Sequence, residues 1–309
     1  MKSRLSGWTK RQRAWPRIGL FLLLLALVWL PFGAAVYLPE AWLGESNAAQ
    51  IVVLALLYVG FLVGFPYWGK LIHGWQHPFR QCGLIWQAQT GRDLLLAFVI
   101  GALGVFSLFG IETLLGWATP STPSPRLVRF VFEGLLMALA VSFAEEMLFR
   151  GWVLAELEKD YSSISALLMD AVFFATTHFI KPWTEIVRTF PQFFGLVGLG
   201  MALVWARRSP TGSKAGLKPS SKADLMNGAG DRVSRLGYPI GLHAGLIWGY
   251  YIVNVGGLSE YTGRAPEWIT GIDRNPLAGL MGLILLGLIA QQFAKTAQAK
   301  TTQSCLDQA

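Results

Sequence analysis

The chain has 309 residues, of which 53% are hydrophobic and only 14% are charged, and its mean hydropathy is +0.44. Soluble globular domains carry about 25% charged residues, so this composition excludes an ordinary soluble domain and favours a polytopic membrane protein. The net charge of +8 is also found in nucleic-acid-binding proteins. Here the basic residues gather in the predicted loops of a membrane protein, so we expect no nucleic-acid partner.

The apolar segments predict an all-α chain with about eight transmembrane helices. A basic tail, residues 1–17, precedes a first apolar run at 18–38, which is about long enough to span a bilayer. A cleaved signal peptide is the alternative for this run, because Gly33 and two alanines resemble the small residues before a cleavage site. The other runs lie at 51–68, 93–117, 127–149, 163–180, 190–206, 238–256 and 275–294.

The basic residues predict that both termini are cytoplasmic. With eight spans and the tail inside, 20 of the 26 Lys and Arg residues fall on the cytoplasmic side, an excess typical of cytoplasmic loops. We therefore expect an integral membrane protein in the lipid bilayer. Its predicted parts are helices 1–3 in 18–124, a core of helices 4–8 in 125–294 with a flexible Ser-, Gly- and Lys-rich loop at 207–237, and a cytoplasmic tail at 295–309.

Acidic and basic residues in the fourth apolar run mark the candidate site. An ionisable group in such a segment costs several kcal/mol unless it is paired or faces a wet cavity. Glu146 and Arg150 are four residues apart and can pair on a helix. Glu145 points about 100° away from Glu146, so it stays free for a second partner.

Two histidines, His178 and His243, are candidate partners because they also lie inside apolar runs. Glu145 and His178 are each about 25 Å from the turn near Tyr161, so an antiparallel helical hairpin places them at one depth. His243 is only about 10 Å from the cytoplasmic end of its run. This depth does not obviously match that of the other two residues, and a tilted or broken span leaves the question open. Gly241 and Gly245 beside it predict a close approach by a neighbouring helix.

A carboxylate and two imidazoles support hydrolysis in two ways. The carboxylate can act as a general base on water while the histidines orient it or stabilise an oxyanion. Alternatively, Glu145, His178 and His243 can hold zinc with one position open for water. The residues alone leave both routes open.

Three motifs together resemble the CPBP family of intramembrane endopeptidases, which includes the CAAX prenyl proteases and bacteriocin-processing or bacteriocin-immunity proteins. They are Glu145-Glu146-x-x-x-Arg150, Phe174-x-x-x-His178 and His243, in family order, and the resemblance covers about residues 125–256. Any one motif is weak, but the ordered set on membrane spans is specific.

The resemblance implies an eight-helix fold with an active-site cavity inside the membrane. It implies that Glu145 activates water, that His178 supports it and that His243 is an oxyanion donor, with Glu146, Arg150 and Phe174 in supporting positions. It further implies hydrolysis of a peptide bond in a membrane-embedded or prenylated peptide or protein. We expect no cofactor, with zinc as the alternative.

One position departs from the family pattern. The residue four after His243 is Ile247, where the family has an Asn that stabilises the oxyanion. Asn254 lies about 16 Å along the same helix and cannot take that place. One oxyanion donor contributes about 10²–10³ in rate. Ile247 therefore leaves three alternatives: another group substitutes for the Asn, the activity is weak, or the protein is a non-proteolytic scaffold or chaperone of the same fold. A transporter is a third hypothesis, but it predicts paired broken helices or half-to-half symmetry, and the sequence shows neither.

We expect structural roles for the remaining ionisable residues in or beside the apolar runs. Asp170 is expected to bond a neighbouring span, Glu133 to pair with Arg129, and Glu112 to play no catalytic part. His73 and His77 have the spacing of a metal pair, but no Glu follows His73 in an H-E-x-x-H motif, so we expect an interfacial loop there.

Overall fold

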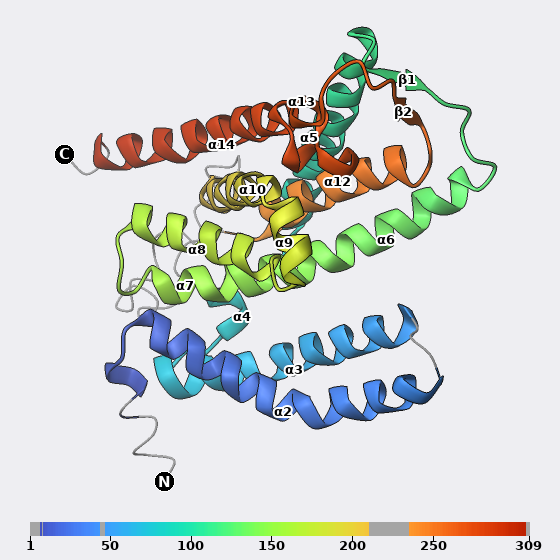
Figure 1. Ribbon diagram of the computed structural model, residues 1–309. Helices are drawn as coiled ribbons and strands as arrows, with labels where there is room; N and C mark the ends of the chain where they lie inside the picture. The colour runs from blue at the N-terminus through green and yellow to red at the C-terminus, as the bar shows by residue number, and fades with distance from the viewer. Residues whose placement is uncertain (1–6, 8, 44–46, 210–234, 307–309) are drawn as a thin grey trace.

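The computed structural model describes residues 7, 9–43, 47–209 and 235–306 (Figure 1). Most of the predicted loop 207–237 and part of the predicted tail 1–17 lie outside the described residues.

The described chain is almost entirely helical, as predicted. Two three-residue strands, Ala118–Pro120 (β1) and Ser259–Tyr261 (β2), pair antiparallel and join the connections that follow α5 and α12. The helices are α2 (Ala14–Leu43), α3 (Asn47–His73), α4 (Pro78–Gln81), α5 (Ala88–Leu114), α6 (Leu127–Glu146), the π-helical segment η1 (Met147–Val153), α7 (Leu154–Leu157), α8 (Ser163–Thr177), α9 (Trp183–Thr189), α10 (Pro191–Arg208), α12 (Gly237–Asn254), α13 (Glu267–Thr270), the 3₁₀ turns η2 (Ile272–Arg274) and η3 (Pro276–Ala278), and α14 (Leu280–Leu306).

Each of the eight predicted apolar runs forms a helix, but a count of eight membrane spans is not confirmed. In the described chain, five helices are long and apolar enough to cross a membrane, or six if α9 and α10, which meet at 72°, form one broken span. Helix α8 has only 15 residues, fewer than the ~20 that a span needs. Helix α12 has 18 residues but contains Pro, His and several Gly, which lower its hydropathy. The chain is therefore an all-α polytopic membrane protein.

The helices form a bundle with α12 near its centre. Helix α12 packs against α5, α6 and α10, while α10 also packs against α8 and α14 (Figure 1). The predicted close approach at Gly241 and Gly245 is confirmed, and the neighbour is α5. A Cβ atom would lie 2.0 Å from the Leu94 carbonyl oxygen at Gly241 and 2.1 Å from that of Phe98 at Gly245, closer than non-bonded atoms approach.

Helices α2 and α3 form a hairpin on one flank of the bundle (Figure 1). The hairpin contacts the core through Trp152 of η1, which is fully buried and whose ring centroid lies 4.6 Å from that of Phe21. The side of the hairpin away from the core exposes large apolar side chains such as Leu27 and Leu54. Such a surface requires a membrane or a partner to cover it.

A buried ionic contact explains why the first helix begins before the apolar run. Helix α2 starts at Ala14, four residues earlier than expected, and so includes Arg17. The Arg17 guanidinium is buried and lies 3.0 Å from a Glu156 carboxylate oxygen and 2.9 Å from one of Asp160. This pairing offsets the free-energy cost of burying the Arg17 charge. It also links the hairpin of α2 and α3 to α7.

Candidate active site

The helix that carries the two adjacent glutamates changes its winding directly after them. Helix α6 ends at Glu146, and the following seven residues form the π-helical segment η1. Segments of π-helix are rare and frequently occur at functional sites. The segment places Glu146 and Arg150 inside the protein, both with fully buried side chains, whereas the side chain of Glu145 is 27% exposed.

Glu146 and Arg150 form the predicted pair within a larger buried network. A guanidinium nitrogen of Arg150 donates to Glu146 Oε1 at 3.1 Å and another donates to the Gly200 carbonyl at 3.2 Å. Arg150 Nε also lies 3.4 Å from Asp170 Oδ2, so the predicted bond from Asp170 to a neighbouring span is an ion pair. The Arg150 guanidinium lies 4.3 Å from the centroid of the Phe174 ring, a cation–π contact.

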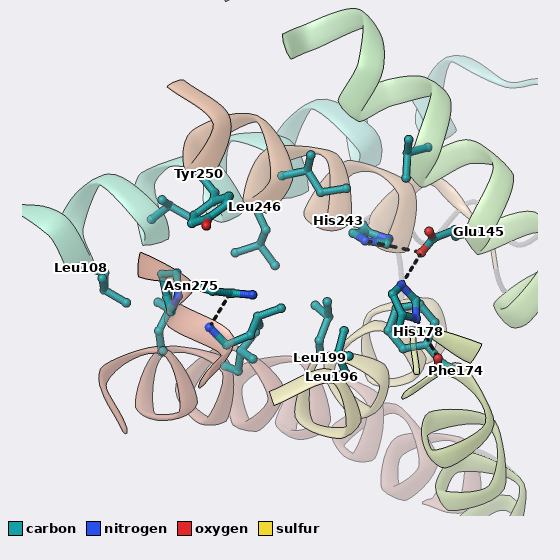
Figure 2. A pocket seen from close by; sticks show the side chains of 18 residues that line it. Leu108, Glu145, Phe174, His178, Leu196, Leu199, His243, Leu246, Tyr250 and Asn275 are labelled. Atoms are coloured by element: carbon teal, nitrogen blue, oxygen red, sulfur yellow. Dashed lines mark hydrogen bonds and ion pairs between the residues drawn. The ribbon is translucent and has the colours of Figure 1, made fainter. Parts of the chain in front are cut away.

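The structure brings Glu145, His178 and His243 together (Figure 2). Glu145 Oε2 lies 3.8 Å from His178 Nε2 and 3.9 Å from His243 Nε2. Among the described residues, no hydrogen-bond donor reaches this oxygen although it is shielded from solvent. Polar atoms separated by more than 3.5 Å often share a bridging water, and the gap between these three atoms has that size.

In both histidines, the hydrogen bond at Nδ1 determines whether Nε2 faces Glu145 as a donor or as an acceptor. His178 follows the last residue of α8, and its Nδ1 lies 2.8 Å from the Phe174 carbonyl oxygen. Because a carbonyl oxygen only accepts, Nδ1 carries the proton. His243 Nδ1 lies 2.9 Å from Glu146 Oε1, so it donates in the same way. In the neutral form, both rings therefore present the Nε2 lone pair toward Glu145.

The structure answers the open question of how His243 reaches Glu145. The estimate from the sequence assumed that the helix begins at the membrane surface. Helix α12 instead begins inside the protein, where Leu236 and Gly237 are buried and the Leu236 amide donates to the Gly83 carbonyl. A helix that starts deeper needs fewer residues to reach the level of Glu145.

These three side chains line one end of a cavity of about 330 Å³, within the range typical of small-ligand sites. Its walls come from α5, α6, α8, α10, α12, η3 and α14 and are mainly aliphatic, with Leu108, Leu196, Leu199 and Leu246 among the lining residues (Figure 2). Ile247 also lines the cavity, so an apolar side chain stands where the family pattern has Asn. Asn254 donates to the Tyr250 carbonyl of its own helix and is not among the residues that line this cavity, so it does not take the place of the family Asn.

Sequence reasoning missed two further polar residues of this cavity, Tyr250 and Asn275. Asn275 directly precedes Pro276 before the last helix. An Asn-Pro pair indicates a turn, but it does not indicate that the turn faces a cavity between other helices. Tyr250 lies seven residues after His243, and this spacing places it on the same face of a helix.

The other ionisable candidates lie outside this cavity. Glu112 is buried and accepts a hydrogen bond from the Tyr261 hydroxyl at 3.0 Å, and the expected Arg129–Glu133 pair is present at 2.8 Å. His73 is the last residue of α3 and its Nε2 lies 2.5 Å from Glu156 Oε1, whereas His77 is exposed. The two histidines therefore do not form a metal pair. Burial raises the pKa of the Cys82 thiol to about 12, so this cysteine is protonated and is not a nucleophile.

The three-residue cluster does not have the geometry of a zinc site. Ligand atoms about 2.0–2.1 Å from a tetrahedral zinc are ~3.3 Å apart, and the separations here are 3.8 and 3.9 Å. Within the described parts of the chain, no group of three His, Cys, Asp or Glu side chains is arranged to hold a metal ion.

A comparison of the sequence with family models agrees with the motifs. Residues 127–215 match the model described as Rce1-like, type II CAAX prenyl endopeptidase. This segment begins with α6 and extends past α10, so it contains Glu145 and His178 but not His243. Neither a curated protein nor a solved structure matches the chain. The segment that supplies Glu145 and His178 thus carries the signature of the type II CAAX prenyl endopeptidases, which confirms the predicted family resemblance.

Proposed function

We propose that the protein is an intramembrane endopeptidase in which Glu145 activates a water molecule. The observation that carries this proposal is the convergence of Glu145 Oε2 with two imidazole nitrogens within 3.9 Å at the wall of an apolar cavity. The Glu145 carboxylate and the Nε2 lone pairs of His178 and His243 all accept hydrogen bonds. A water molecule has two hydrogens and can donate to two of these acceptors at once. An apolar cavity that contains such a cluster suits a peptide with apolar side chains.

The proposed reaction proceeds without a covalent enzyme intermediate. Glu145 removes a proton from the water as its oxygen attacks the scissile carbonyl carbon, and His178 Nε2 accepts the second water hydrogen to orient the attack. When His243 is protonated on both nitrogens, Glu146 accepts a hydrogen bond from Nδ1–H. The second donor, Nε2–H, can then donate to the oxyanion. The carbon–nitrogen bond then breaks, and Glu145 returns the proton to the leaving nitrogen.

The network around Arg150 has a positioning role in this proposal. Glu146 accepts from both Arg150 and His243 through the same oxygen, Oε1. Arg150 in turn bonds α10 at Gly200 and pairs with Asp170 of α8. The network therefore links η1, α8, α10 and α12 and fixes the orientation of the His243 ring relative to Glu145.

We propose that the site lies within the bilayer and that its substrate is a membrane-embedded or prenylated peptide or protein. Helices α8 and α12 are too short or too polar to qualify as spans on their own, but they pack against longer apolar helices. If both also lie at membrane depth, the chain has eight transmembrane segments with both termini on the cytoplasmic side, in agreement with the distribution of Lys and Arg.

Ile247 supports a second candidate, a scaffold or chaperone of the same fold without proteolytic activity. The aliphatic side chain offers no hydrogen bond to an oxyanion, and one missing donor lowers a rate by about 10²–10³. This alternative predicts that Glu145→Gln leaves the biological phenotype unchanged, whereas substitutions on an exposed helix face abolish it.

The test is cleavage of a farnesylated peptide ending in Cys and three further residues by the detergent-purified protein, followed by mass spectrometry. We expect cleavage by the wild type and loss of cleavage in His178→Ala. The proposal fails if His178→Ala is as active as the wild type. If the wild type cleaves neither this peptide nor a membrane-embedded helical peptide, the scaffold is the better interpretation.

A further inference from the structure

A second cavity, separate from the catalytic one, lies between α3 and the core of the bundle. It has a volume of about 660 Å³ and is lined by α3, by α6 and by the connection between α3 and α5, which contains α4. Figure 1 shows α4 between α3 and the rest of the bundle. None of its lining residues belongs to the catalytic cavity. We call this cavity the hairpin groove, and its volume is in the range of small-ligand sites.

The groove joins an apolar part to a basic part. Along α3, its wall contains Leu62, Pro66 and Lys70, whose spacing of four places them on one face of the helix. Lys70 lies about 12 Å from Leu62 along the helix axis. Phe143 of α6 borders the Leu62 end, because its ring centroid lies 6.4 Å from that of Tyr58, one turn before Leu62.

The basic part has unpaired cations. Lys70 and Arg80 both line the groove and are exposed, and in the described chain neither side chain makes an ion pair or a hydrogen bond. No aspartate or glutamate is among the described residues that line the groove. The imidazole of His77, which also lines it, can donate a further hydrogen bond. Clustered cationic donors of this kind complement an anion with several oxygens, such as a phosphate group.

Helix α3 is long enough to place the two parts at different depths in a bilayer. Its 27 residues extend about 40 Å, more than the ~30 Å of the hydrocarbon core. Lys70 lies three residues before the end of the helix at His73, so it reaches the headgroups, whereas Leu62 lies among the acyl chains. Trp86 also lines the groove and is 86% exposed, and tryptophan is enriched at the membrane interface.

We propose that the hairpin groove binds an anionic phospholipid, with the phosphate at Lys70 and Arg80 and the first part of the acyl chains against Leu62 and Phe143. The apolar wall favours a lipid over free phosphate, which would use the basic part alone. The unpaired cations favour an anionic lipid over phosphatidylcholine, whose quaternary ammonium group they repel. The bound lipid contacts both α3 and α6, so it links the hairpin to the helix that carries Glu145. This inference does not depend on the proposed peptidase function.

The test is the dissociation constant of dioleoylphosphatidylglycerol for the detergent-purified full chain, measured by native mass spectrometry. We expect the double variant Lys70→Gln, Arg80→Gln to bind this lipid at least about tenfold more weakly, because each cation contributes about fivefold. Dioleoylphosphatidylcholine should bind the wild type about tenfold more weakly than the anionic lipid, and the double variant should not change its affinity further.

The matched control is the double variant Arg13→Gln, Arg92→Gln. It removes the same charge from two exposed residues that do not line the groove, so the affinity should stay within about twofold of the wild type because distant charges are screened. Equal affinities of the two double variants for the anionic lipid overturn the site. Equal affinities of the wild type for the two lipids also overturn it.

Leu62→Trp tests the apolar part, because the larger side chain occupies the space assigned to the acyl chains. We expect it to weaken binding of the anionic lipid, whereas Val63→Trp, at an exposed position outside the groove, should not. Millimolar inorganic phosphate should not displace the lipid. Displacement by phosphate, or unchanged affinity in Leu62→Trp, would leave only a phosphate site and overturn the lipid proposal. Equal unfolding temperatures without lipid show that the variants are folded, so that the charge variants alone decide the proposal if Leu62→Trp is not.

Discussion

Two adjacent glutamates have different surroundings, and this difference determines their roles. Glu146 has a fully buried side chain bonded to Arg150 and His243, whereas Glu145 is partly exposed to the cavity and lacks a donor at Oε2 within the described chain. The i,i+4 spacing of Glu146 and Arg150 was sufficient to predict their pairing. It could not predict Asp170 and Gly200 as further partners of Arg150, because they come from helices whose packing the sequence does not specify.

We expect Glu146→Gln to lower the free energy of unfolding by about 2–3 kcal/mol, because it removes a charge partner from the buried Arg150 guanidinium. Glu145→Gln is the matched control and should change stability by less than about 1 kcal/mol. Thermal or denaturant unfolding in detergent measures both. Equal stability losses in the two variants would contradict the assignment of distinct roles.

Ile247 provides a test of the oxyanion site. Because Ile247 lines the catalytic cavity one turn after His243, Ile247→Asn introduces an amide donor where the family pattern has one. We expect kcat for the farnesylated peptide to rise by up to about 10²-fold, with a smaller change in KM. Ile247→Leu keeps the site apolar and serves as the control. An Asn variant no faster than the Leu variant would show that this position does not contact the oxyanion.

At the level of the helices, contact between α5 and α12 positions His243. The glycines in α12 predicted a close approach, and the structure identifies α5 as the partner. The hydropathy pattern predicted the long core helices α6, α8, α10, α12 and α14. It did not predict η1, the 72° bend between α9 and α10 or the buried start of α12. These features depend on contacts between distant helices, and for that reason the sequence left the depth of His243 open.

A single methyl group tests this contact. Gly241→Ala places a Cβ 2.0 Å from the Leu94 carbonyl oxygen, so α12 must shift away from α5. We expect a loss of about 1–3 kcal/mol in unfolding free energy and a lower kcat because His243 moves with the helix.

Gly287→Ala in α14 is the control, since a Cβ there has no atom within 4 Å. It should be neutral or slightly stabilising, because alanine favours helix more than glycine does. If Gly241→Ala is as stable and active as Gly287→Ala, the close approach does not determine the site geometry.

For the whole molecule, composition correctly predicted an integral membrane protein, and the exposed apolar side chains of α2, α3, α5 and α6 agree with it. The number of spans could not be predicted as reliably, because a helix shielded by other helices does not need the length or hydropathy of one that faces lipid. Helix α12 illustrates this point, since it is largely buried and carries His243 of the candidate site.

The proposed orientation predicts that a membrane-impermeant reagent reaches residues on the outer side of the membrane but not those on the cytoplasmic side. In a cysteine-free background, Ser3→Cys lies in the basic tail, while Thr122→Cys is exposed in the external connection after β1. In sealed cells or vesicles with the cytoplasmic face inside, a membrane-impermeant maleimide should label Thr122→Cys at once. It should label Ser3→Cys only after permeabilisation. The reverse pattern would invert the topology.

The central claim is that Glu145 activates the water that cleaves the peptide bond. Its most direct measurement is the cleavage rate of a farnesylated peptide by purified Glu145→Gln, compared with Glu133→Gln, the same substitution in an exposed ion pair of the same helix. We predict that Glu145→Gln loses at least about 10³-fold in kcat/KM and that Glu133→Gln retains wild-type activity. Cleavage by Glu145→Gln at the rate of Glu133→Gln would contradict the account.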